Sequence, residues 1–448
     1  MLSLSAKNST LIFLFFTSLI HLSISAFAHA DDESGLLAFK KGIISDPSGI
    51  LSKWKSGTDC CTWPGVSCQD TNRVTLLQIF GQSNTPNGYL SSTISPSLSK
   101  LKELNGIFLQ HLGNISGPFP SFLFSLPNIQ YVFIEYNKLS GKLPENIGNL
   151  SKLSALSFAG NRFSGPIPSS IGGLTQLTQL NLDHNLLTGT IPASMKALKN
   201  LSTLTLEYNK LSGAIPDIFS GFNNFYVLEL SHNKLSGNIP GSVVALAPKI
   251  RFLELGHNAL SGNIPDFLGK LQALDTLDLS WNKFSGTVPK TFSNLTKIFN
   301  LDLSHNSLVD PFPQLNVKGI ESLDLSYNKF HLVNIPKWVT SSTIIYSLKL
   351  AKCGLKLKLD DWKPVETYFY DYIDLSNNEI TGSPVKLLTG QIIWNLVFGK
   401  VPKDVAGLRM LNVSHNHLCG QLPAMQFTAS AFAGNDCLCG SPLPACKA

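Results

Sequence analysis

Acidic and ring-bearing side chains recur at fixed positions through the middle of this 448-residue sequence. A carboxylate stands four residues before a recurring asparagine, and a histidine or aromatic residue stands directly before it. Carboxylates stacked in a row repel one another, and a basic partner would relieve that repulsion. Aromatic side chains frequently anchor protein interfaces. The candidate binding residues at these two positions are Tyr208, Glu229, His232, Glu254, His257, Asp278, Trp281, Asp302, His305, Asp324 and Tyr327.

The same residue types could also serve catalysis or metal binding. His232 and His257 fall in consecutive repeats near Glu229 and Glu254, and imidazoles with carboxylates are a possible zinc ligand set. These histidines, however, occupy a recurring position rather than one unique site, which favours a solvated row of surface histidines. The sequence has no glycine-rich phosphate loop and no nucleophile elbow. We therefore expect no enzymatic activity, no cofactor and no metal.

A repeat of about 24 residues positions these side chains. Asparagines begin the segments NRFSGPIP and NLLTGTIP at Asn161 and Asn185, and the series continues to Asn328 at spacings of 22 to 25 residues. Before each asparagine the sequence has the form L-x-x-L-x-L, as in Leu180 and Leu182 ahead of Asn185. This is the leucine-rich-repeat signature.

The repeat predicts the fold. Its leucines point inward from a short strand, and the asparagine side chain can hydrogen-bond the backbone of the following turn. Because one repeat cannot bury its apolar face alone, neighbours stack into a solenoid with one curved parallel sheet. We expect an α/β repeat solenoid of about 14 repeats whose concave sheet suits a macromolecular partner. Cys353 stands where the pattern accepts either asparagine or cysteine, so we expect it to be buried in the asparagine row.

Two terminal segments and the repeat wording carry a family resemblance. The LSGxIP sequence after the asparagine is similar to the plant extracellular repeat, which forms a right-handed superhelix. Trp54 to Cys68 resembles the plant N-terminal repeat cap. Asn435 to Cys446 resembles the Cys-rich C-terminal cap of polygalacturonase-inhibiting proteins and of longer secreted relatives named after DNA-damage toleration. The likeness covers essentially all of residues 31–448.

The resemblance also implies how the eight cysteines pair. The family usually has another cysteine near the mature N-terminus to bond Cys60, and this sequence offers none there. Either Cys60 is a free thiol or the connectivity in that cap is altered. We expect one free thiol in addition to Cys353. The implied disulfides are Cys61–Cys68, Cys419–Cys437 and Cys439–Cys446.

Composition and the N-terminus indicate an exported chain. Hydrophobic residues make up 43% and charged residues 14%, and the net charge of +6 is scattered, which argues against a nucleic-acid partner. Lys7, the apolar run Leu11 to Leu22 and the small residues around Ala28 fit a signal peptide, and no later stretch is long enough to span a membrane. We expect a signal peptide (1–30), an N-terminal cap (31–73), leucine-rich repeats (74–418) and a C-terminal cap (419–448).

One interval departs from the repeat. Asn395 follows Asn378 by only 17 residues, and no L-x-x-L-x-L fits between them. The interval 383–394 is then either a deletion, such as a splice or gene-model artefact, or a genuine short repeat. In both cases the Asn395 repeat lacks a full strand of its own. We expect weak packing and preferential proteolysis between Ser383 and Trp394.

Five N-x-[ST] sequons are present in the expected mature chain. Asn114 is either a sequon or a buried asparagine of the repeat row. Asn412 should face the concave surface, where a glycan would crowd it. The sequons expected on the convex or flanking side, and therefore the best candidates for N-linked glycans, are Asn149, Asn200 and Asn294.

Two binding functions fit these features. The resemblance implies inhibition of a secreted cell-wall hydrolase such as polygalacturonase in plant defence. The alternative is a ligand-binding or scaffold component of a plant receptor-kinase complex. In both cases the chain, secreted to the extracellular space or cell wall, would bind a basic protein surface. We expect that nearby carboxylates raise the pKa of the histidines, so that binding weakens with salt and with falling pH.

Overall fold

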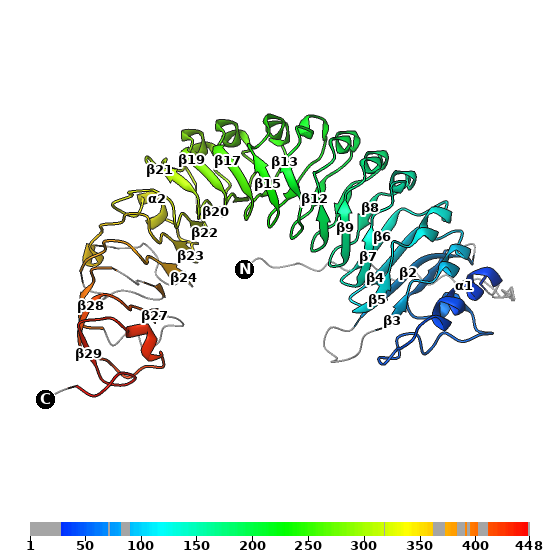
Figure 1. Cartoon of the computed structure of the whole chain (residues 1–448), viewed down its shortest axis with the longest axis horizontal. Coiled ribbons are helices and arrows are strands. Elements are labelled where there is room, and N and C mark those ends of the chain that lie inside the picture. Colours follow the sequence, from blue (N-terminus) through cyan, green and yellow to red (C-terminus); the bar gives the residue numbers. More distant parts are fainter. Residues whose placement is uncertain are drawn as a thin grey trace, which may run out of the picture.

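The chain forms an arch whose inner side is one long curved sheet, as the computed structural model shows (Figure 1). The repeats follow one another along the arch from the blue N-terminal cap to the red C-terminal cap. This is the repeat solenoid that the sequence predicts. The structure describes residues 28–69, 72–81, 90–317, 319–361, 372–382, 390–391, 395–401 and 411–446. The predicted signal peptide (1–30) therefore lies almost wholly outside the described residues.

The concave face is a 16-stranded sheet within the part of the chain that the structure describes. Its first strand pairs antiparallel with the second, and every later pair is parallel and in register. In order, the strands are β1 (Val66–Cys68), β2 (Val74–Phe80), β4 (Gly106–Gln110), β6 (Tyr131–Glu135), β8 (Ala155–Ser157), β10 (Gln179–Asn181), β12 (Thr203–Thr205), β14 (Val227–Glu229), β16 (Phe252–Glu254), β18 (Thr276–Asp278), β20 (Asn300–Asp302), β22 (Ser322–Asp324), β23 (Ser347–Lys349), β24 (Tyr372–Asp374), β25 (Gly390–Gln391) and β27 (Leu411–Asn412).

Smaller sheets follow the asparagine of each repeat. One contains β3 (Ser91–Thr93), β5 (Asn114–Gly117), β7 (Lys138–Lys142), β9 (Arg162–Pro166) and β11 (Leu186–Thr188). The next contains β13 (Ser212–Ala214), β15 (Lys234–Gly237), β17 (Ala259–Asn263), β19 (Lys283–Thr287) and β21 (Ser307–Val309). The last contains β26 (Phe398–Gly399), β28 (His417–Gln421) and β29 (Cys437–Cys439).

Short helices cover the outer side of the arch (Figure 1). Several are single 3₁₀ turns that begin directly after the proline of an LSGxIP-type segment, because proline fixes its φ near the helical value and ends the preceding strand. The helices are α1 (Ala30–Lys41), α2 (Lys337–Thr340), η1 (Cys60–Thr62), η2 (Pro96–Lys100), η3 (Ser121–Ser125), η4 (Ile147–Asn149), η5 (Ser169–Gly173), η6 (Ala193–Ala197), η7 (Phe219–Gly221), η8 (Gly241–Leu246), η9 (Asp266–Lys270), η10 (Lys290–Asn294), η11 (Leu359–Asp361) and η13 (Ala429–Phe432).

The inward leucines and the asparagine row hold the repeats together. Leu204 and Leu206 are at most 1% exposed, as the alternation of side chains along a strand requires. The Asn209 amide donates to the carbonyl oxygens of Leu182 and Leu206, at 2.9 and 3.2 Å, and its Oδ1 accepts from the backbone N–H of Leu187 at 3.0 Å. Asn209 therefore links its own turn to the turn of the preceding repeat and satisfies buried backbone groups that have no partner within the sheet.

Different interactions close the two ends. In the N-terminal cap, Asp32 on α1 is fully buried and pairs with Arg73 at 2.9 Å, while Trp54 stacks on Trp63. The three disulfides implied by the resemblance, Cys61–Cys68, Cys419–Cys437 and Cys439–Cys446, are all formed. Cys60 and Cys353 are free and buried. Burial, and then the Asp32 carboxylate, raises the pKa of the Cys60 thiol to about 12, so this thiol is not activated as a nucleophile.

The asparagine row continues through the irregular repeats, where a cysteine replaces one asparagine. Cys353 is buried as predicted, and its thiol donates to the Leu325 carbonyl oxygen at 3.4 Å. Asn395 is also a member of the row, because its amide donates to the Leu375 carbonyl oxygen at 3.0 Å. The two-residue strand β25 precedes Asn395, so a short strand is present in the interval. Residues 383–389 and 392–394 lie outside the described residues, and the predicted proteolysis there stays a prediction.

The proposal that Asn114 belongs to the buried row is wrong. Leu112, fully buried, follows His111, whose φ of 55° marks the same turn as the residue before each row asparagine. Asn114 instead lies two residues later on β5, where it is half-buried and its Oδ1 accepts from the Lys138 ammonium group. An apolar side chain therefore fills the row position at this early repeat.

Candidate functional site

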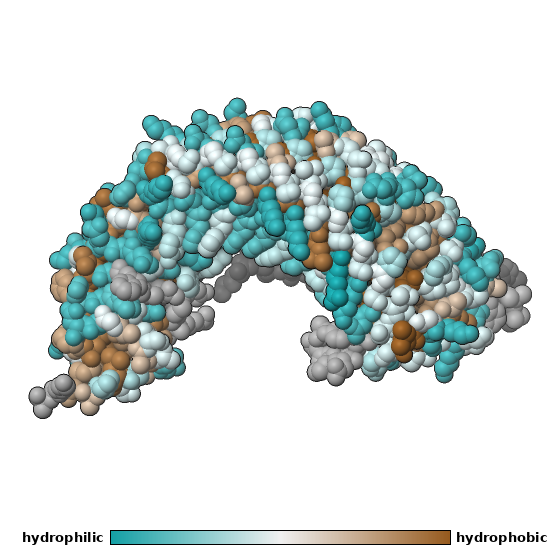
Figure 2. Space-filling model, in the orientation of Figure 1, coloured by the Kyte–Doolittle hydropathy of each residue, from teal (hydrophilic) through white to brown (hydrophobic). Residues whose placement is uncertain are grey.

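Five carboxylates form an uninterrupted row on the concave sheet, here called the acidic ladder. The parallel register places each residue directly beside the next, one per strand from β14 to β22. Strands in a sheet lie about 4.8 Å apart, so the charges are close neighbours. Figure 2 shows hydrophilic side chains along this inner arc. The acidic ladder consists of Glu229, Glu254, Asp278, Asp302 and Asp324.

Crowding perturbs the ionisation of the acidic ladder. Burial, followed by the charges of Glu229 and Asp278, raises the pKa of Glu254 to about 7. Burial and then the charges of Asp324 and Asp278 raise the pKa of Asp302 to about 7. The pKa of Glu229 is also raised, first by burial. The row therefore holds charge at a free-energy cost that a cationic partner would reduce.

Local bonds orient the aspartates of the acidic ladder. One oxygen of Asp278 accepts from the backbone N–H of Ser280 at 2.8 Å, and Asp302 makes the same bond with Ser304 at 2.9 Å. Gly256 leaves room for the Asp278 carboxylate, because a Cβ there would lie 2.4 Å from Asp278 Oδ2. The aspartates thus have a structural role in their own turns, and each keeps a second oxygen for other contacts.

The acidic ladder ends where a cation enters the row. Lys349 occupies the next register position after Asp324, and its Nζ lies 3.5 Å from Asp324 Oδ2. Asp374 follows on β24 and is separated from the acidic ladder by this lysine. The row therefore has one internal counter-cation, at its C-terminal limit, among the described residues.

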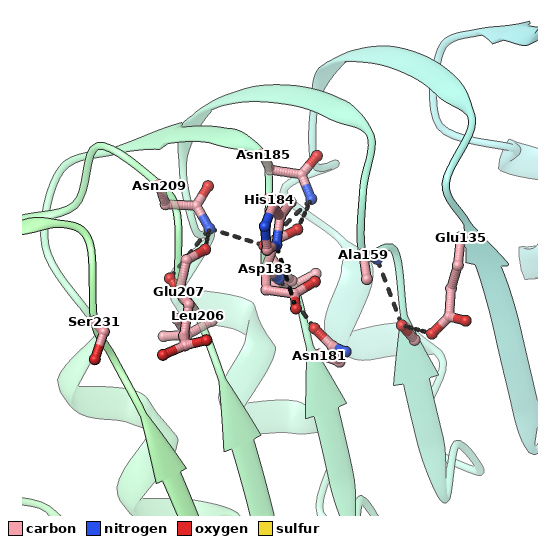
Figure 3. Close-up of polar contacts among 12 residues, drawn as sticks. Glu135, Ala159, Asn181, Asp183, His184, Asn185, Leu206, Glu207, Asn209 and Ser231 are labelled. Carbon is pink, nitrogen blue, oxygen red and sulfur yellow. Dashed lines mark hydrogen bonds and ion pairs between the residues drawn. The ribbon is translucent and has the colours of Figure 1, made fainter. Parts of the chain in front are cut away.

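A second group of acids lies two positions further along the earlier strands (Figure 3). Burial, and then the charges of Glu229 and Glu254, raises the pKa of Glu207 to about 7. Burial also raises the pKa of Asp183, against the opposing effect of His184, whose Nδ1 lies 3.5 Å from Asp183 Oδ2. These residues extend the acidic surface toward β10.

The rings before the row asparagines stack on one another without a gap. Neighbouring centroids are 3.6 to 5.3 Å apart, and all interplanar angles are 25° or less. Each of these residues has a φ between 48° and 55°, a left-handed conformation that turns its side chain toward the same edge. We call this set the ring stack: His184, Tyr208, His232, His257, Trp281, His305 and Tyr327.

Stacking changes how the aromatic residues can act. Tyr208, Trp281 and Tyr327 are 44%, 49% and 39% exposed, so they are available as contacts. Their faces, however, lie against neighbouring rings, which leaves mainly the ring edges and polar tips for a partner. The sequence places these residues together correctly, and the stacking itself depends on the left-handed backbone that the residue pattern does not reveal.

The expectation of raised histidine pKa values is wrong for two members of the ring stack. Burial, and then repulsion from His257, lowers the pKa of His232, although Asp278 acts in the opposite direction. Burial also lowers the pKa of His305. Sequence reasoning counted the nearby carboxylates but omitted the desolvation that stacking causes. Three carboxylates of this face, Glu207, Glu254 and Asp302, have pKa values raised to about 7.

Two other surface features were not anticipated. Phe108 and Phe133 stack at 5.0 Å on the concave face near its N-terminal end. Basic residues line the start of the smaller sheets, directly after the row asparagines. Both lie at matching positions of neighbouring repeats, so a comparison of those positions in the sequence could have revealed them. Within the described part of the chain, no group of three or more His, Cys, Asp or Glu residues is arranged to hold a metal ion.

The predicted glycan sites are exposed. Asn149 lies in η4, Asn294 lies in η10, and Asn200 follows η6, all at the outer turns of the arch. Asn412 is half-buried on β27 of the concave sheet, as expected. The three exposed sequons leave the acidic ladder and the ring stack uncovered.

Family models match both the cap and the repeats. The leucine rich repeat N-terminal domain matches residues 29–69, and leucine rich repeats match 128–150, 152–174, 176–198, 199–260 and 248–308. Over 145 residues the chain is 36% identical to the DNA damage-repair/toleration protein DRT100 of Arabidopsis thaliana, which is 30% of this chain and 38% of that protein. The chain is a plant leucine-rich-repeat protein.

This plant leucine-rich-repeat protein is also similar to an inhibitor of an enzyme. It is 35% identical over 106 residues to a polygalacturonase inhibitor of Pyrus communis, which is 23% of this chain and 30% of the inhibitor. The alignments thus span less than two fifths of the length of either curated relative.

Solved structures share the fold. The crystal structure of PEPR1 with AtPEP1 matches with a TM-score of 0.62 at 26% identity, over 91% of this chain and 66% of that one. The ectodomain of the Arabidopsis thaliana receptor kinase GASSHO1/SCHENGEN3, in complex with CASPARIAN STRIP INTEGRITY FACTOR 2, matches with a TM-score of 0.60 at 29% identity. That match covers 80% of this chain and 51% of the ectodomain. Among the described residues, no helix has the length and apolar character needed to cross a membrane.

Proposed function

We propose that this protein binds a basic protein surface on its concave face, between β12 and β22. The observation that carries the proposal is the acidic ladder: five in-register carboxylates with one internal counter-cation, beside a stack of exposed rings. A partner that supplies lysine or arginine side chains would relieve the repulsion along the row, and Tyr208, Trp281 and Tyr327 would provide edge contacts.

The finer proposal is that the partner is a secreted cell-wall hydrolase and that binding inhibits it. Support comes from the similarity to polygalacturonase inhibitors of Pyrus communis, Arabidopsis thaliana and Vitis vinifera. The chain itself performs no catalysis in this proposal. We further propose that residues 1–30 direct export to the extracellular space or cell wall. N-terminal sequencing of the secreted protein should then begin at or near Asp31.

An inhibition assay tests the finer proposal. Purified secreted protein is titrated into a panel of purified endopolygalacturonases, and the release of reducing ends from polygalacturonic acid is measured. At least one enzyme should be inhibited, and the inhibition should weaken when salt is raised from 50 to 300 mM, values chosen because screening grows over this range. If no enzyme of the panel is bound or inhibited, the hydrolase proposal is wrong.

A second candidate function is ligand binding within a receptor complex. The match to the ectodomain of the receptor kinase GASSHO1/SCHENGEN3 in complex with CASPARIAN STRIP INTEGRITY FACTOR 2 favours it, together with the match to PEPR1-AtPEP1. Binding of a purified receptor ectodomain to this chain in solution, together with no binding to the polygalacturonase panel, would support this function over inhibition.

A further inference from the structure

A row of basic side chains runs beside the ring stack. Each stands directly after a row asparagine, and four of the six begin a strand of the smaller sheets. Five of the six are exposed, and Lys138 is half-buried with its ammonium group donating to Asn114 Oδ1. The equivalent positions at 186, 259 and 307 hold Leu, Ala and Ser. We call these residues the basic row: Lys138, Arg162, Lys210, Lys234, Lys283 and Lys329.

Among the residues that the structure describes, the exposed members of the basic row have no acidic partner. None of them takes part in an ion pair among the residues that the structure describes. Other cations on the same arch are paired, as Arg251 is with Asp275 and Lys356 with Glu379. The exposed members of the basic row therefore form a stripe of unpaired cations.

The two charged stripes lie close to each other, with the ring stack between them. In a repeat such as 229–234, the acid precedes the asparagine by four residues, the ring by one, and the base follows it by one. Five residues of extended chain span at most about 17 Å, which bounds the distance between the stripes. The positions before and after the asparagine also border one surface, since His415 and His417 line the same hollow near the C-terminus.

We propose that the protein partner reaches over the ring stack and presents an acidic stripe to the basic row while its basic stripe faces the acidic ladder. This inference rests on the proposed function and adds the second half of the partner's charge pattern. The two stripes match by charge complementarity: the acidic ladder has one carboxylate per strand, about every 4.8 Å, and beside it the basic row has a cation at every second repeat, at Lys234, Lys283 and Lys329, so together they call for two parallel, oppositely charged stripes on the partner.

A protein fits this pattern better than a linear acidic polysaccharide does. A continuous polyanion on the basic row would lie within about 17 Å of the acidic ladder and be repelled by it. The row also lacks charge at three of its nine positions from 138 to 329. A protein helix can carry both signs, because residues three and four apart form a stripe with neighbours about 5–6 Å apart, close to the strand spacing.

Two designed helical peptides of 22 residues test the inference. The banded peptide carries lysines along one face and glutamates along the adjacent face, and the lysine-only peptide has glutamine in place of each glutamate. Affinity for the full secreted chain is measured by calorimetry at low salt. The banded peptide should bind about 5- to 10-fold more tightly than the lysine-only peptide, as expected for three exposed charge pairs acting together.

Matched variants locate the effect. Changing Lys210, Lys234 and Lys283 together to Gln should abolish the preference for the banded peptide. Changing Lys196, Lys270 and Lys297 of the outer surface together to Gln removes the same net charge and should leave that preference intact. Equal affinity of the two peptides for the unaltered chain would overturn the inference and leave the proposed function standing.

Two further outcomes separate the possibilities. If the lysine-only peptide binds the unaltered chain and the Glu254→Gln, Asp278→Asn, Asp302→Asn variant equally well, the proposed function itself fails. If polygalacturonic acid binds the unaltered chain, displaces the banded peptide and loses its affinity in the Lys210, Lys234, Lys283 variant, the basic row is a polysaccharide site. That result would overturn the inference of an acidic protein stripe.

Discussion

The central and C-terminal repeats share one architecture but differ in regularity. From Asn185 to Asn306 the row asparagines are spaced 24 or 25 residues apart and every turn is bonded by an amide. After Asn328 the row passes through a cysteine, and the interval from Asn378 to Asn395 shrinks to 17 residues. The concave sheet nevertheless continues through both regions. The solenoid thus tolerates a substituted row residue and a shortened repeat, as long as some side chain bonds each turn.

The outward side chains differ more sharply between the two regions. In the central repeats the carboxylates and rings form continuous stripes. Beyond Tyr327 a lysine enters the acidic row at 349, and the ring position holds Lys352 and then Asn377. The candidate binding surface therefore ends where the repeat becomes irregular. The fold depends on the inward pattern, and the proposed binding depends on an outward pattern confined to the regular repeats.

The largest expected effect tests the asparagine row in the two regions. Asn209→Ala removes four hydrogen bonds and leaves buried backbone groups unsatisfied, so we expect the free energy of unfolding to fall by about 3–5 kcal/mol. Cys353→Ala removes only weak thiol bonds and should cost about 1–2 kcal/mol. Guanidinium denaturation followed by circular dichroism measures both. Equal losses would mean that the substitute thiol stabilises its turn as well as an amide does.

The pH dependence of stability tests the central region alone. In the folded protein, Glu207, Glu254 and Asp302 have pKa values of about 7, whereas the ordinary pKa values of these carboxyl groups are 3.8–4.5. Between these values the folded state retains protons that the unfolded chain has released, so the free energy of unfolding falls as pH rises from about 4.5 to 7. The Glu254→Gln, Asp278→Asn, Asp302→Asn variant should flatten this fall by about 2–4 kcal/mol, allowing for solvent screening.

Binding of a basic partner has the opposite pH dependence. Affinity should rise over the same pH window, because the acidic ladder gains charge as its carboxylates ionise. A His232→Phe, His257→Phe variant should keep this dependence, since carboxylates cause it. If the histidine variant, which keeps all of its carboxylates, loses the pH dependence of affinity, then the imidazoles cause that dependence.

Limited proteolysis compares the two regions in the native protein. We expect the first cut between Ser383 and Trp394, because the 17-residue interval cannot supply a complete repeat. The central repeats should resist at the same protease concentration. Mass spectrometry of the first fragments identifies the site, and cleavage spread evenly along the arch would contradict the expected weakness of the short repeat.

The smallest expected effect concerns the glycans. Asn149→Gln, Asn200→Gln and Asn294→Gln together should reduce the mass of the secreted protein by the glycans lost, while affinity for a concave-face partner changes less than about twofold. The reason is that these residues lie at the outer turns, away from the acidic ladder. A larger change in affinity would place part of the interface on the outer surface.

Sequence predicted the fold well because the inward pattern is redundant. Repeated leucines and asparagines specify the solenoid. Even Cys353 could be assigned to the row by its spacing, and Asn395 by the NLVFGKVP segment that it begins. Asn114 could not, because an inserted residue shifts the register and Leu112 fills the position instead. Outward residues were placed on the correct face by strand alternation. Their ionisation was not predictable, since desolvation of His232 depends on the stacked neighbours that the left-handed turns bring together.

Binding of a basic protein surface by the acidic ladder can be tested by one comparison of affinities. The Glu254→Gln, Asp278→Asn, Asp302→Asn variant is compared with a Glu103→Gln, Glu145→Gln, Asp266→Asn variant, which loses the same charge from exposed positions off the concave sheet. Both are titrated with the lysine-only peptide and with any endopolygalacturonase that the unaltered chain binds. The account predicts at least about tenfold weaker binding for the ladder variant alone, together with a shallower salt dependence. Unchanged affinity of a folded ladder variant would contradict it.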